Sequence, residues 1–239
     1  RKDKLHGVLS LAMGWFRSQL KSSNGIHAFQ YLTKERNLSE GTLETFELGY
    51  APNEWDALLN HLQNIEKVPL DLIKASGLVV PRKNGSGLYD RFRNRIIVPI
   101  HDRQRRVIGF GGRSLDGSDP KYLNSPETEI FEKGKNLFGL DKAANSIRKN
   151  DCAVVVEGYF DVIALHESGI THSVASLGTA LNASQITQLC RCTDSKRIIL
   201  NFDSDSAGIR AANRAITEVE HLAMQGQVEL RVLQLPSGK

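Results

Sequence analysis

The stretch AVVVEGYFDVIALHESG, residues 153–169, carries the pattern that decides the fold. Four apolar residues come directly before Glu157 and Gly158, and a helical segment then extends to a second glycine. The stretch RIILNFDSD, residues 197–205, repeats this order, because its β-rich run also ends in acidic residues. Short apolar strands that alternate with helices are typical of a mostly parallel sheet with helices on both faces. The sequence therefore predicts an α/β fold.

The same alternation continues between and after these two stretches. Further strands are expected at residues 173–176 and 228–235, and helices at 159–168 and 184–191. A last helix ends at a glycine, and its apolar residues are expected to share one face: Ile209, Ala212, Ile216, Val219 and Ala223. We expect these strands to form one sheet.

The first part of the chain is mainly helical in pattern up to residue 75. Apolar residues recur at helical spacing in its first helix: Leu5, Val8, Leu9, Ala12, Phe16 and Leu20. Ser39 and Thr42 are candidate helix caps before the next apolar run. Trp55 precedes leucines at helical spacing and is predicted to lie in the core with them.

A β-rich region follows these helices. The runs 95–100 and 106–110 flank polar turn residues and predict a hairpin. Residues 111–126 are rich in Gly, Ser, Asp and Pro, which favours a loop. The sequence therefore predicts a mixed α/β domain at 1–149 and a second domain, with the mostly parallel sheet, at 150–239.

Acidic residues follow two of the predicted parallel strands at the point where each strand ends. Glu157 comes directly after one strand, and Asp203 and Asp205 follow another. If the two strands are neighbours, these carboxylates converge at the carboxyl edge of the sheet, where open α/β sheets bind ligands. Crowded carboxylates repel one another, and Mg²⁺ both relieves this repulsion and prefers oxygen ligands. Asp161, one helical turn past Glu157, could join them.

Each of these acids also has a structural explanation. Glu157 could cap the helix that follows it, Asp203 and Asp205 could form a turn, and Asp161 could be a surface acid of the first helical turn. Because both acidic motifs lie at strand ends, we favour the metal site over these alternatives.

Composition excludes several classes of protein. The 239 residues are 40% hydrophobic and 24% charged, as in an ordinary globular protein. No apolar run approaches the ~20 residues of a membrane span, and the first residues lack the apolar core of a secretory signal. Cys152, Cys190 and Cys192 are too few for a disulfide scaffold, so we expect an intracellular, reducing compartment. Cys190 and Cys192 could suggest a metal site, but no second Cys or His pair lies at ligand spacing nearby, so a structural role is favoured.

Charge is distributed unevenly along the chain. The net charge is +4, but residues 81–149 hold 15 Lys and Arg against 8 Asp and Glu, whereas residues 150–239 hold 7 against 10. A basic middle followed by an acidic end suits a protein that binds a polyanion together with a divalent cation. The alternative is an uneven solvated surface.

The acidic segments and several others resemble those of a known family. EGYFD (157–161) and DSDSAG (203–208) are similar to the acidic motifs of the Toprim domain, which bacterial primases, topoisomerases and some nucleases share. Segments outside these motifs, in matching order, resemble the bacterial-type (DnaG-like) replicative primase in particular. They are GYAP (49–52), RFRNR (91–95), GFGGR (109–113), KYLNSPET (121–128), FEKG (131–134), LFGL (137–140) and ASLGT (175–179).

The resemblance implies an enzyme that synthesises short RNA primers on single-stranded DNA during replication, by metal-dependent nucleotidyl transfer. It implies that Glu157, Asp203 and Asp205 hold Mg²⁺, with Mn²⁺ as an alternative ion and Asp161 as an additional ligand. The Toprim-type sheet at 150–239 would carry this site.

The resemblance also implies a basic ridge for nucleotide phosphates and template. Arg113, Lys121 and Lys133 match its positions, and Arg91 and Arg93 are added to it, although arginines beside a strand are often plain surface residues. Scattered histidines and the absence of a Ser-His-Asp set give no indication of covalent catalysis.

The chain departs from the family at its two ends. The family has an N-terminal zinc-binding module, and it continues past residue 239 into a further metal-binding segment and a helical part that engages the replicative helicase. We therefore expect a primase core that lacks both ends, with zinc only in the missing module. Single-stranded DNA, ribonucleoside triphosphates and, through the missing part, the helicase are the expected partners of a monomer without membrane contact. The bacterial cytoplasm at the nucleoid, or an organelle, is the expected location.

Two other functions remain open at this point. Another Toprim enzyme, a topoisomerase or nuclease, would share the acidic motifs, but a topoisomerase needs a nucleophilic tyrosine on a separate domain. A non-catalytic nucleic-acid-binding fragment would not need the intact acidic motifs.

Overall fold

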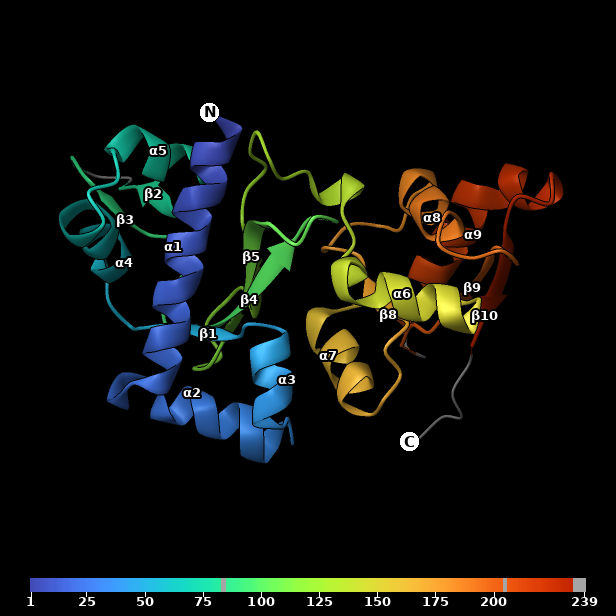
Figure 1. The fold of residues 1–239 in the computed structure, drawn as a ribbon, viewed down its shortest axis with the longest axis horizontal. Coiled ribbons are helices and arrows are strands. Elements are labelled where there is room, and N and C mark those ends of the chain that lie inside the picture. Colours follow the sequence, from blue (N-terminus) through green and yellow to red (C-terminus); the bar gives the residue numbers. More distant parts are fainter. Residues whose placement is uncertain (83–84, 204–205, 234–239) are drawn as a thin grey trace. The chain divides into compact units, whose positions relative to one another are not determined.

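The chain divides into two compact units, Arg1–Phe131 and Glu132–Lys239, drawn in blue to green and in yellow to red (Figure 1). The computed structural model describes residues 1–82, 85–203 and 206–233. Each unit has its own sheet and its own hydrophobic core.

Helices make up the first half of the first unit. The apolar residues predicted for the first helix are all buried, and Ser39 Oγ accepts a hydrogen bond from Thr42 N (3.2 Å) at the start of the third. The helices are α1 (Lys2–Lys21), α2 (Ile26–Gln30), α3 (Glu40–Thr45), α4 (Ala57–Asn60) and α5 (Leu70–Ala75), and π-helical turns extend α2 over Tyr31–Glu35 and α4 over His61–Ile65.

Within its described residues, the first unit has an antiparallel sheet of order β1-β4-β5-β6 and a second antiparallel sheet in which β2 pairs with β3. The strands are β1 (Gly49–Ala51), β2 (Val79–Pro81), β3 (Leu88–Asp90), β4 (Arg95–His101), β5 (Val107–Ser114) and β6 (Tyr122–Asn124). The predicted hairpin is therefore confirmed as β4 and β5.

The predicted loop at 111–126 is partly wrong, because β5 continues to Ser114 and β6 lies within the same range. Glycine in this strand serves a close contact rather than a turn. A Cβ on Gly112 would lie 2.7 Å from Cδ1 of Phe92, which packs against the strand. The extension places Arg113 on a regular strand.

Helix α1 packs directly on the larger sheet. A Cβ on Gly49 would lie 2.7 Å from Cβ of Phe16, so only glycine allows the helix to approach β1 this closely. Phe16 also contacts the rings of Phe92 and Phe110 edge-on, with centroids 6.5 and 5.4 Å away. These aromatic side chains form the centre of the first core.

The second unit contains a parallel sheet with helices around it, as the α/β prediction required. Its strand order is β10-β9-β7-β8, and each neighbouring pair is parallel. The strands are β7 (Ala153–Val156), β8 (Ser173–Ala175), β9 (Arg197–Leu200) and β10 (Glu229–Val232), and the helices are α6 (Leu140–Asn150), α7 (Tyr159–Glu167), α8 (Ala183–Cys190) and α9 (Ser206–Met224).

Helix α9 buries a narrower face than its pattern predicts. Ala212, Ala215 and Val219 are buried, whereas Ile209 and Ile216 are 51% and 41% exposed. Ala215 and Val219 belong to the buried cluster of the parallel sheet. The predicted apolar face of this helix is therefore only partly buried.

Residues 132–149 pack with the parallel sheet. In α6, Leu140, Ala143 and Ile147 belong to the same buried cluster as Val155 and Val174 of the sheet. The boundary between the two compact units therefore lies between residues 131 and 132. The domain division at residues 149 and 150 stays a prediction.

In the part of the chain that the structure describes, no helix has the length and apolarity that crossing a membrane requires.

Candidate functional site

The two strands that precede the acidic motifs are neighbours in the sheet. Val155 of β7 is paired with Leu200 of β9, and Asn201 N donates to Val155 O (2.8 Å) just beyond β9. Because the strands are parallel, both end at the same edge, and this edge carries Glu157 and Asp203. The condition on which the expected convergence of these acids depended is therefore met.

Glu157 and Asp203 are in direct contact at this edge. Oε1 of Glu157 accepts a hydrogen bond from the backbone N of Asp203 at 3.0 Å, although 46 residues separate them in the chain. Both residues are exposed to solvent. One carboxylate therefore holds the backbone beside the other.

The first turn of α9 passes unusually close to these two residues. A Cβ on Gly208 would lie 2.0 Å from the carbonyl oxygen of Asp203 and 2.8 Å from Oε1 of Glu157, distances that no side chain allows. The end of β7, the end of β9 and the start of α9 therefore meet at one place.

Of the other two predicted metal ligands, Asp161 is described by the structure and Asp205 is not. Oδ2 of Asp161 accepts a hydrogen bond from Gly158 N (3.0 Å), so this exposed carboxylate caps the start of α7. Asp205 lies outside the described residues. Within residues 1–82, 85–203 and 206–233, no three His, Cys, Asp or Glu side chains form a group that could hold a metal ion. The metal-binding set therefore stays a prediction.

The chemistry of Glu157 and Asp203 nevertheless suits Mg²⁺. Both offer carboxylate oxygens, which this hard cation prefers, and both are open to solvent, so that the ion could keep several waters. Neither a histidine nor a thiolate, the softer ligands of zinc, occurs beside them in either motif.

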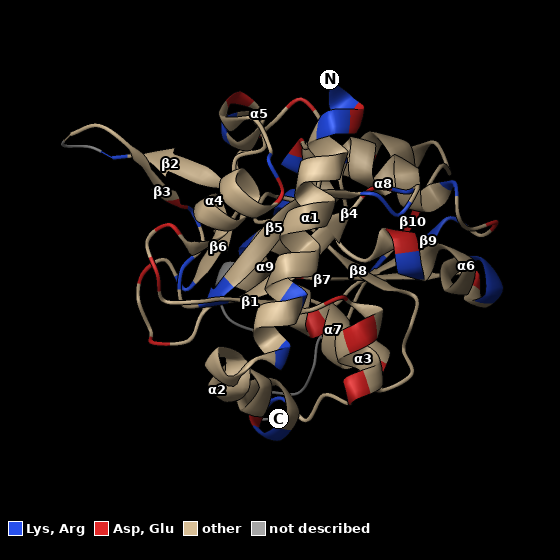
Figure 2. Cartoon of the chain, turned by 60° about the vertical axis from the view of Figure 1, so that its left-hand side comes forward, with Lys and Arg blue, Asp and Glu red and all other residues tan. Residues whose placement is uncertain are grey.

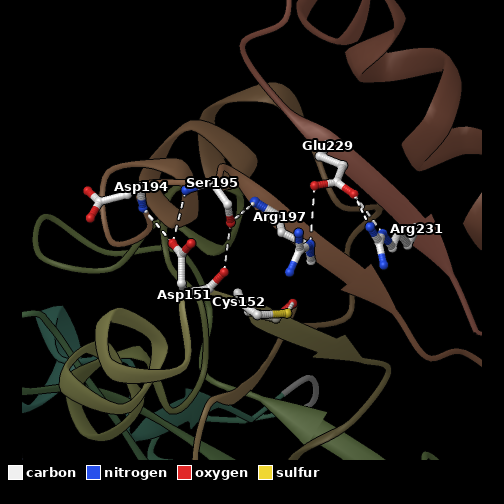
Figure 3. A network of polar contacts seen from close by, with 8 residues as sticks. Asp151, Cys152, Asp194, Ser195, Arg197, Glu229 and Arg231 are labelled. Atoms are coloured by element: carbon white, nitrogen blue, oxygen red, sulfur yellow. Dashed lines mark hydrogen bonds and ion pairs between the residues drawn. The ribbon is translucent and has the colours of Figure 1, made fainter.

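The opposite end of this sheet is held by polar contacts, shown in Figure 3. Oδ1 of Asp151, just before β7, accepts hydrogen bonds from the backbone N of Asp194 (2.7 Å) and Ser195 (2.9 Å), just before β9. Glu229 of β10 pairs with Arg197 of β9 (3.2 Å) and with Arg231. These contacts join the amino ends of three parallel strands.

The thiols have no catalytic features. Cys152, Cys190 and Cys192 are free and buried. Burial raises the pKa of the Cys152 and Cys190 thiols, which disfavours the reactive thiolate.

In the first unit, Arg113 and Arg36 both lie against the ring of Tyr31, and neither Tyr31 nor Arg36 was predicted to belong to a site. Arg113 of β5 lies over the ring of Tyr31, with its guanidinium carbon 4.6 Å from the centroid. Arg36 approaches the same ring (5.5 Å), and its Nε donates to the Tyr31 hydroxyl at 2.6 Å. Tyr31 and Arg36 carry no sequence signal of this role, because only the fold brings their turn to β5.

Lys121 lies next to Arg113 across the sheet. Its carbonyl accepts a hydrogen bond from Ser114 N (2.9 Å), and its Nζ is 5.8 Å from the ring of Tyr122, which is paired with Arg113. Lys121 is exposed and Arg113 is half-buried. The structure therefore places Arg113 near the end of β5 and Lys121 directly before β6, beside each other in the backbone of the sheet. Figure 2 marks the Lys and Arg residues of the chain in blue.

Arg91 and Arg93 line a separate pocket of about 500 Å³ in the same unit. The guanidinium carbon of Arg93 lies 4.4 Å from the Trp55 ring centroid and 4.9 Å from that of Tyr89. Nε of Arg91 donates to Asn124 O (3.0 Å), and burial lowers the pKa of its guanidinium. The pocket combines aromatic faces with cations.

The prediction that Trp55 lies in the core is wrong, since its side chain is 57% exposed. Trp55 stands before the first turn of α4, whereas Leu58, Leu59 and Leu62, within and after that turn, are buried as predicted. The helical pattern therefore held for the leucines but did not extend back to the tryptophan.

Lys133 belongs to the second unit, in a 3-10 turn held by α8. The fully buried Gln185 donates through Nε2 to the carbonyls of Asn136 (2.8 Å) and Lys133 (3.3 Å). Asn182 Nδ2 donates to Gly134 O at 2.9 Å. Three amide hydrogen bonds thus fix the backbone of the turn, which leaves the Lys133 side chain half-buried.

Comparisons with known proteins match both units. Residues 15–144 match the family described as DNA primase catalytic core, N-terminal domain, and residues 151–234 match the Toprim domain. DNA primases of Synechococcus elongatus and Synechocystis sp. are 58% and 48% identical to the chain over 239 and 238 residues, which is 100% of the chain in both cases and 34% and 38% of those proteins. The chain therefore spans about a third of the length of these curated relatives.

Solved structures are similar to the chain throughout its length. The E. coli primase catalytic core is 40% identical with a TM-score of 0.88, covering 98% of this chain and 73% of that one. A DnaG primase catalytic domain bound to ssDNA is 38% identical with a TM-score of 0.88, covering 100% of this chain and 73% of that one. These similarities extend across both units.

Proposed function

Since this chain belongs to the DNA primase catalytic-core family and carries a Toprim domain, we propose that it is the part of a DNA primase that joins ribonucleotides into primers on single-stranded DNA. The observation that carries this proposal is the meeting of Glu157 and Asp203 at the ends of two neighbouring parallel strands. The match over residues 15–144 favours a primase over other Toprim enzymes.

The acidic edge of the second unit is the proposed catalytic site. Glu157, Asp203 and Asp205 would hold Mg²⁺, with Mn²⁺ as a substitute, and Asp161 would support the start of α7 beside them or bind the ion itself. When bound, the metal neutralises phosphate charge and lowers the pKa of the attacking 3′-hydroxyl. Glu157 has a second task, because its hydrogen bond to Asp203 N keeps the two strand ends together.

Basic side chains of both units are the proposed contacts for phosphates. Arg113 is oriented by the ring of Tyr31, and Lys121 directly precedes the adjoining strand, so both suit the triphosphate of an incoming nucleotide. Lys133, on a turn with a fixed backbone, would add charge in the second unit.

The pocket at Trp55 and Arg93 is the proposed template site. Proteins that bind single strands combine cations for the backbone with aromatic faces on which bases stack. The pocket contains both, in Trp55 and Tyr89 on one hand and Arg91 and Arg93 on the other. That a solved relative is described as bound to ssDNA supports this proposal.

The complete protein would have further partners through segments outside these 239 residues. We propose contact with the replicative helicase there, and, from the bacterial relatives, a location on replicating DNA in the cytoplasm.

The test is ribonucleotide incorporation on single-stranded DNA by the full-length protein that carries this chain, with Mg²⁺ titrated. Glu157→Gln and Asp203→Asn are expected to lower kcat by about 100-fold or more, while ssDNA affinity stays within about twofold. Glu220→Gln, an exposed acid on α9, is the matched control and should retain full activity. Normal incorporation by either site variant would refute the catalytic assignment.

A further inference from the structure

The stacked pair at the wall of the template pocket is formed by two segments that are distant in the chain. Trp55 precedes α4, and Arg93 lies between β3 and β4. A planar guanidinium over an exposed indole can slide or tilt unless the two backbones are held in place. Tyr89 and Arg91 line the same pocket from β3 and the residue after it.

Asp90 joins these two segments with four hydrogen bonds. Its backbone N donates to Trp55 O (2.7 Å), and its carbonyl accepts from Nη1 of Arg93 (2.7 Å). Its carboxylate accepts from the backbone N of Leu58 at Oδ2 (2.8 Å) and of Leu59 at Oδ1 (3.0 Å). One residue thus contacts the segment before α4, the start of α4 and the arginine that stacks on Trp55.

The position of Asp90 in its strand fits this arrangement. Side chains alternate along a strand, so Tyr89 and Arg91 face the pocket while Asp90 faces the protein interior, where it is 3% exposed. The first N–H groups of a helix lack partners within the helix, and the two carboxylate oxygens satisfy two of them at α4. The hydrogen bond to Trp55 O holds the backbone two residues before that helix.

We propose that Asp90 is the positioning residue of the template pocket, which holds the Trp55 ring and the Arg93 guanidinium in the stacked geometry that receives single-stranded DNA. The inference rests on the proposed template site. It assigns Asp90 an effect on DNA affinity and none on the nucleotidyl-transfer step, whose acids lie in the other unit.

A carboxylate is the group that these contacts require. Asparagine has one oxygen acceptor, so Asp90→Asn would leave either Leu58 N or Leu59 N opposite an NH₂ donor. Aspartate also reaches both N–H groups with a short side chain that has few rotamers to lose. Asp90→Asn keeps the shape of the side chain and removes one acceptor.

The experiment measures binding of a labelled single-stranded oligonucleotide to the full-length protein, together with the KM for nucleotide at saturating template. Asp90→Asn is expected to weaken ssDNA binding about tenfold, with kcat and nucleotide KM within about twofold. Asp90→Ser, whose hydroxyl can accept a hydrogen bond from one of the two N–H groups, should also weaken ssDNA binding. It serves as a second variant if Asp90→Asn folds poorly.

A double-mutant cycle separates positioning from general destabilisation. In a Trp55→Ala/Arg93→Ala protein, ssDNA binding should be weak already, and Asp90→Asn should weaken it no further. Asp102→Asn is the matched control, because Asp102 also accepts backbone hydrogen bonds, from Gln104 N and Arg106 N, in the turn of the β4–β5 hairpin. It should leave ssDNA affinity unchanged.

The outcomes distinguish the two proposals. If Trp55→Ala/Arg93→Ala binds ssDNA normally, the template site and the role of Asp90 both fall. If that variant binds weakly but Asp90→Asn and Asp90→Ser bind normally, only the role of Asp90 falls. An equal loss from Asp90→Asn with and without the stacked pair would also overturn it, since the effect would then be general.

Discussion

At the scale of single residues, Gly208 shows how one missing side chain shapes the acidic edge. Its hypothetical Cβ would overlap the carbonyl of Asp203 and press on the carboxylate of Glu157. Only glycine therefore lets the first turn of α9 lie against the ends of β7 and β9. The acidic site depends on this residue, although glycine supplies no ligand.

We predict that Gly208→Ala lowers ribonucleotide incorporation at least about tenfold, because the added methyl must displace the backbone of Asp203. Template affinity should stay within about twofold, since the template pocket lies in the first unit. Steady-state incorporation and oligonucleotide binding measure the two effects. Gly7→Ala is the control: nothing lies within 4 Å of a Cβ there, and in the interior of α1 alanine should stabilise by up to about 1 kcal/mol. Full activity of Gly208→Ala would contradict this account of the site.

Asp90 gives a second prediction, from its titration. Burial raises the pKa of this carboxyl from 3.8 to about 6, outweighing the hydrogen bonds from Leu58 N and Leu59 N, and the negative charge of Asp56 adds to the shift while Arg93 opposes it. A folded-state pKa above the unfolded value means that folding takes up a proton between these two pKa values. The contribution of Asp90 to stability is therefore largest below about pH 4 and falls as pH rises through 6.

The measurement is urea unfolding at pH 5 and pH 7.5. The wild type should lose about 1 kcal/mol more stability between these pH values than Asp90→Asn, which cannot titrate at this position. The comparison with Asp90→Asn cancels the other groups that titrate in this range. Equal losses in the two proteins would mean that Asp90 is ionised throughout.

At the scale of elements, the turn at Lys133–Lys135 is an extension of α8 rather than a free loop. Gln185 and Asn182 donate to three carbonyls of residues 133–136, and Gln188 Nε2 donates to Lys135 O at 3.0 Å. Gln185 Oε1 meanwhile accepts from Asn182 N (3.2 Å) as part of the helix cap. The amides of one helix thus define the backbone of a basic turn that lies about 50 residues earlier in the chain.

We predict that Gln185→Glu frees this turn. The substitution keeps the oxygen that caps α8 but removes the two donated hydrogen bonds and places negative charge against carbonyl oxygens. Trypsin cleavage after Lys133 and Lys135, followed by mass spectrometry, should accelerate about tenfold or more, because the protease cleaves only backbone that has locally unfolded from α8. Gln104→Glu, in an exposed turn of the first unit, should leave cleavage at these lysines unchanged. Equal protection in wild type and Gln185→Glu would show that α8 does not hold the turn.

At the scale of the whole molecule, the net charge of a segment does not show how many of its cations are available to a ligand. The segment 81–149 is strongly basic, but α6 within it packs on the parallel sheet, and several of its arginines have structural partners. Nη1 of Arg95, for instance, donates to Pro120 O at 2.8 Å, and Arg106 pairs with Asp102 at 2.8 Å. Net charge therefore overstates the number of cations available to a nucleic acid.

Salt dependence of ssDNA binding tests this reading. Each phosphate contact releases about 0.7 of a counterion on a single strand, so Arg93→Ala should lower the slope of log K against log salt by about 0.7. Arg103→Ala, which removes an exposed charge from the turn at the other end of the β4–β5 hairpin, should leave the slope unchanged. Equal reductions by both variants would mean that charge alone, and not the pocket, binds the strand.

The α/β class, the parallel strands and the two acidic motifs at their ends could all be predicted from local sequence patterns. Periodicity decides which face of an element is apolar, and a strand that ends in acids must present them at the edge of a sheet. The buried residues of α1 follow from these local rules, as does the position of Glu157 and Asp203 at strand ends. That β7 and β9 are neighbours, so that the two acids meet, is a tertiary contact.

Contacts between distant segments could not be predicted in this way. The exposure of Trp55, the stack of Arg113 and Arg36 on Tyr31, and the four hydrogen bonds of Asp90 depend on how chain segments cross. The hydrogen bonds between the 133–135 turn and α8 also join distant segments. A local sequence pattern does not encode such contacts. The periodicity of a helix or strand shows which of its faces is apolar, but it does not show which distant segment packs against that element.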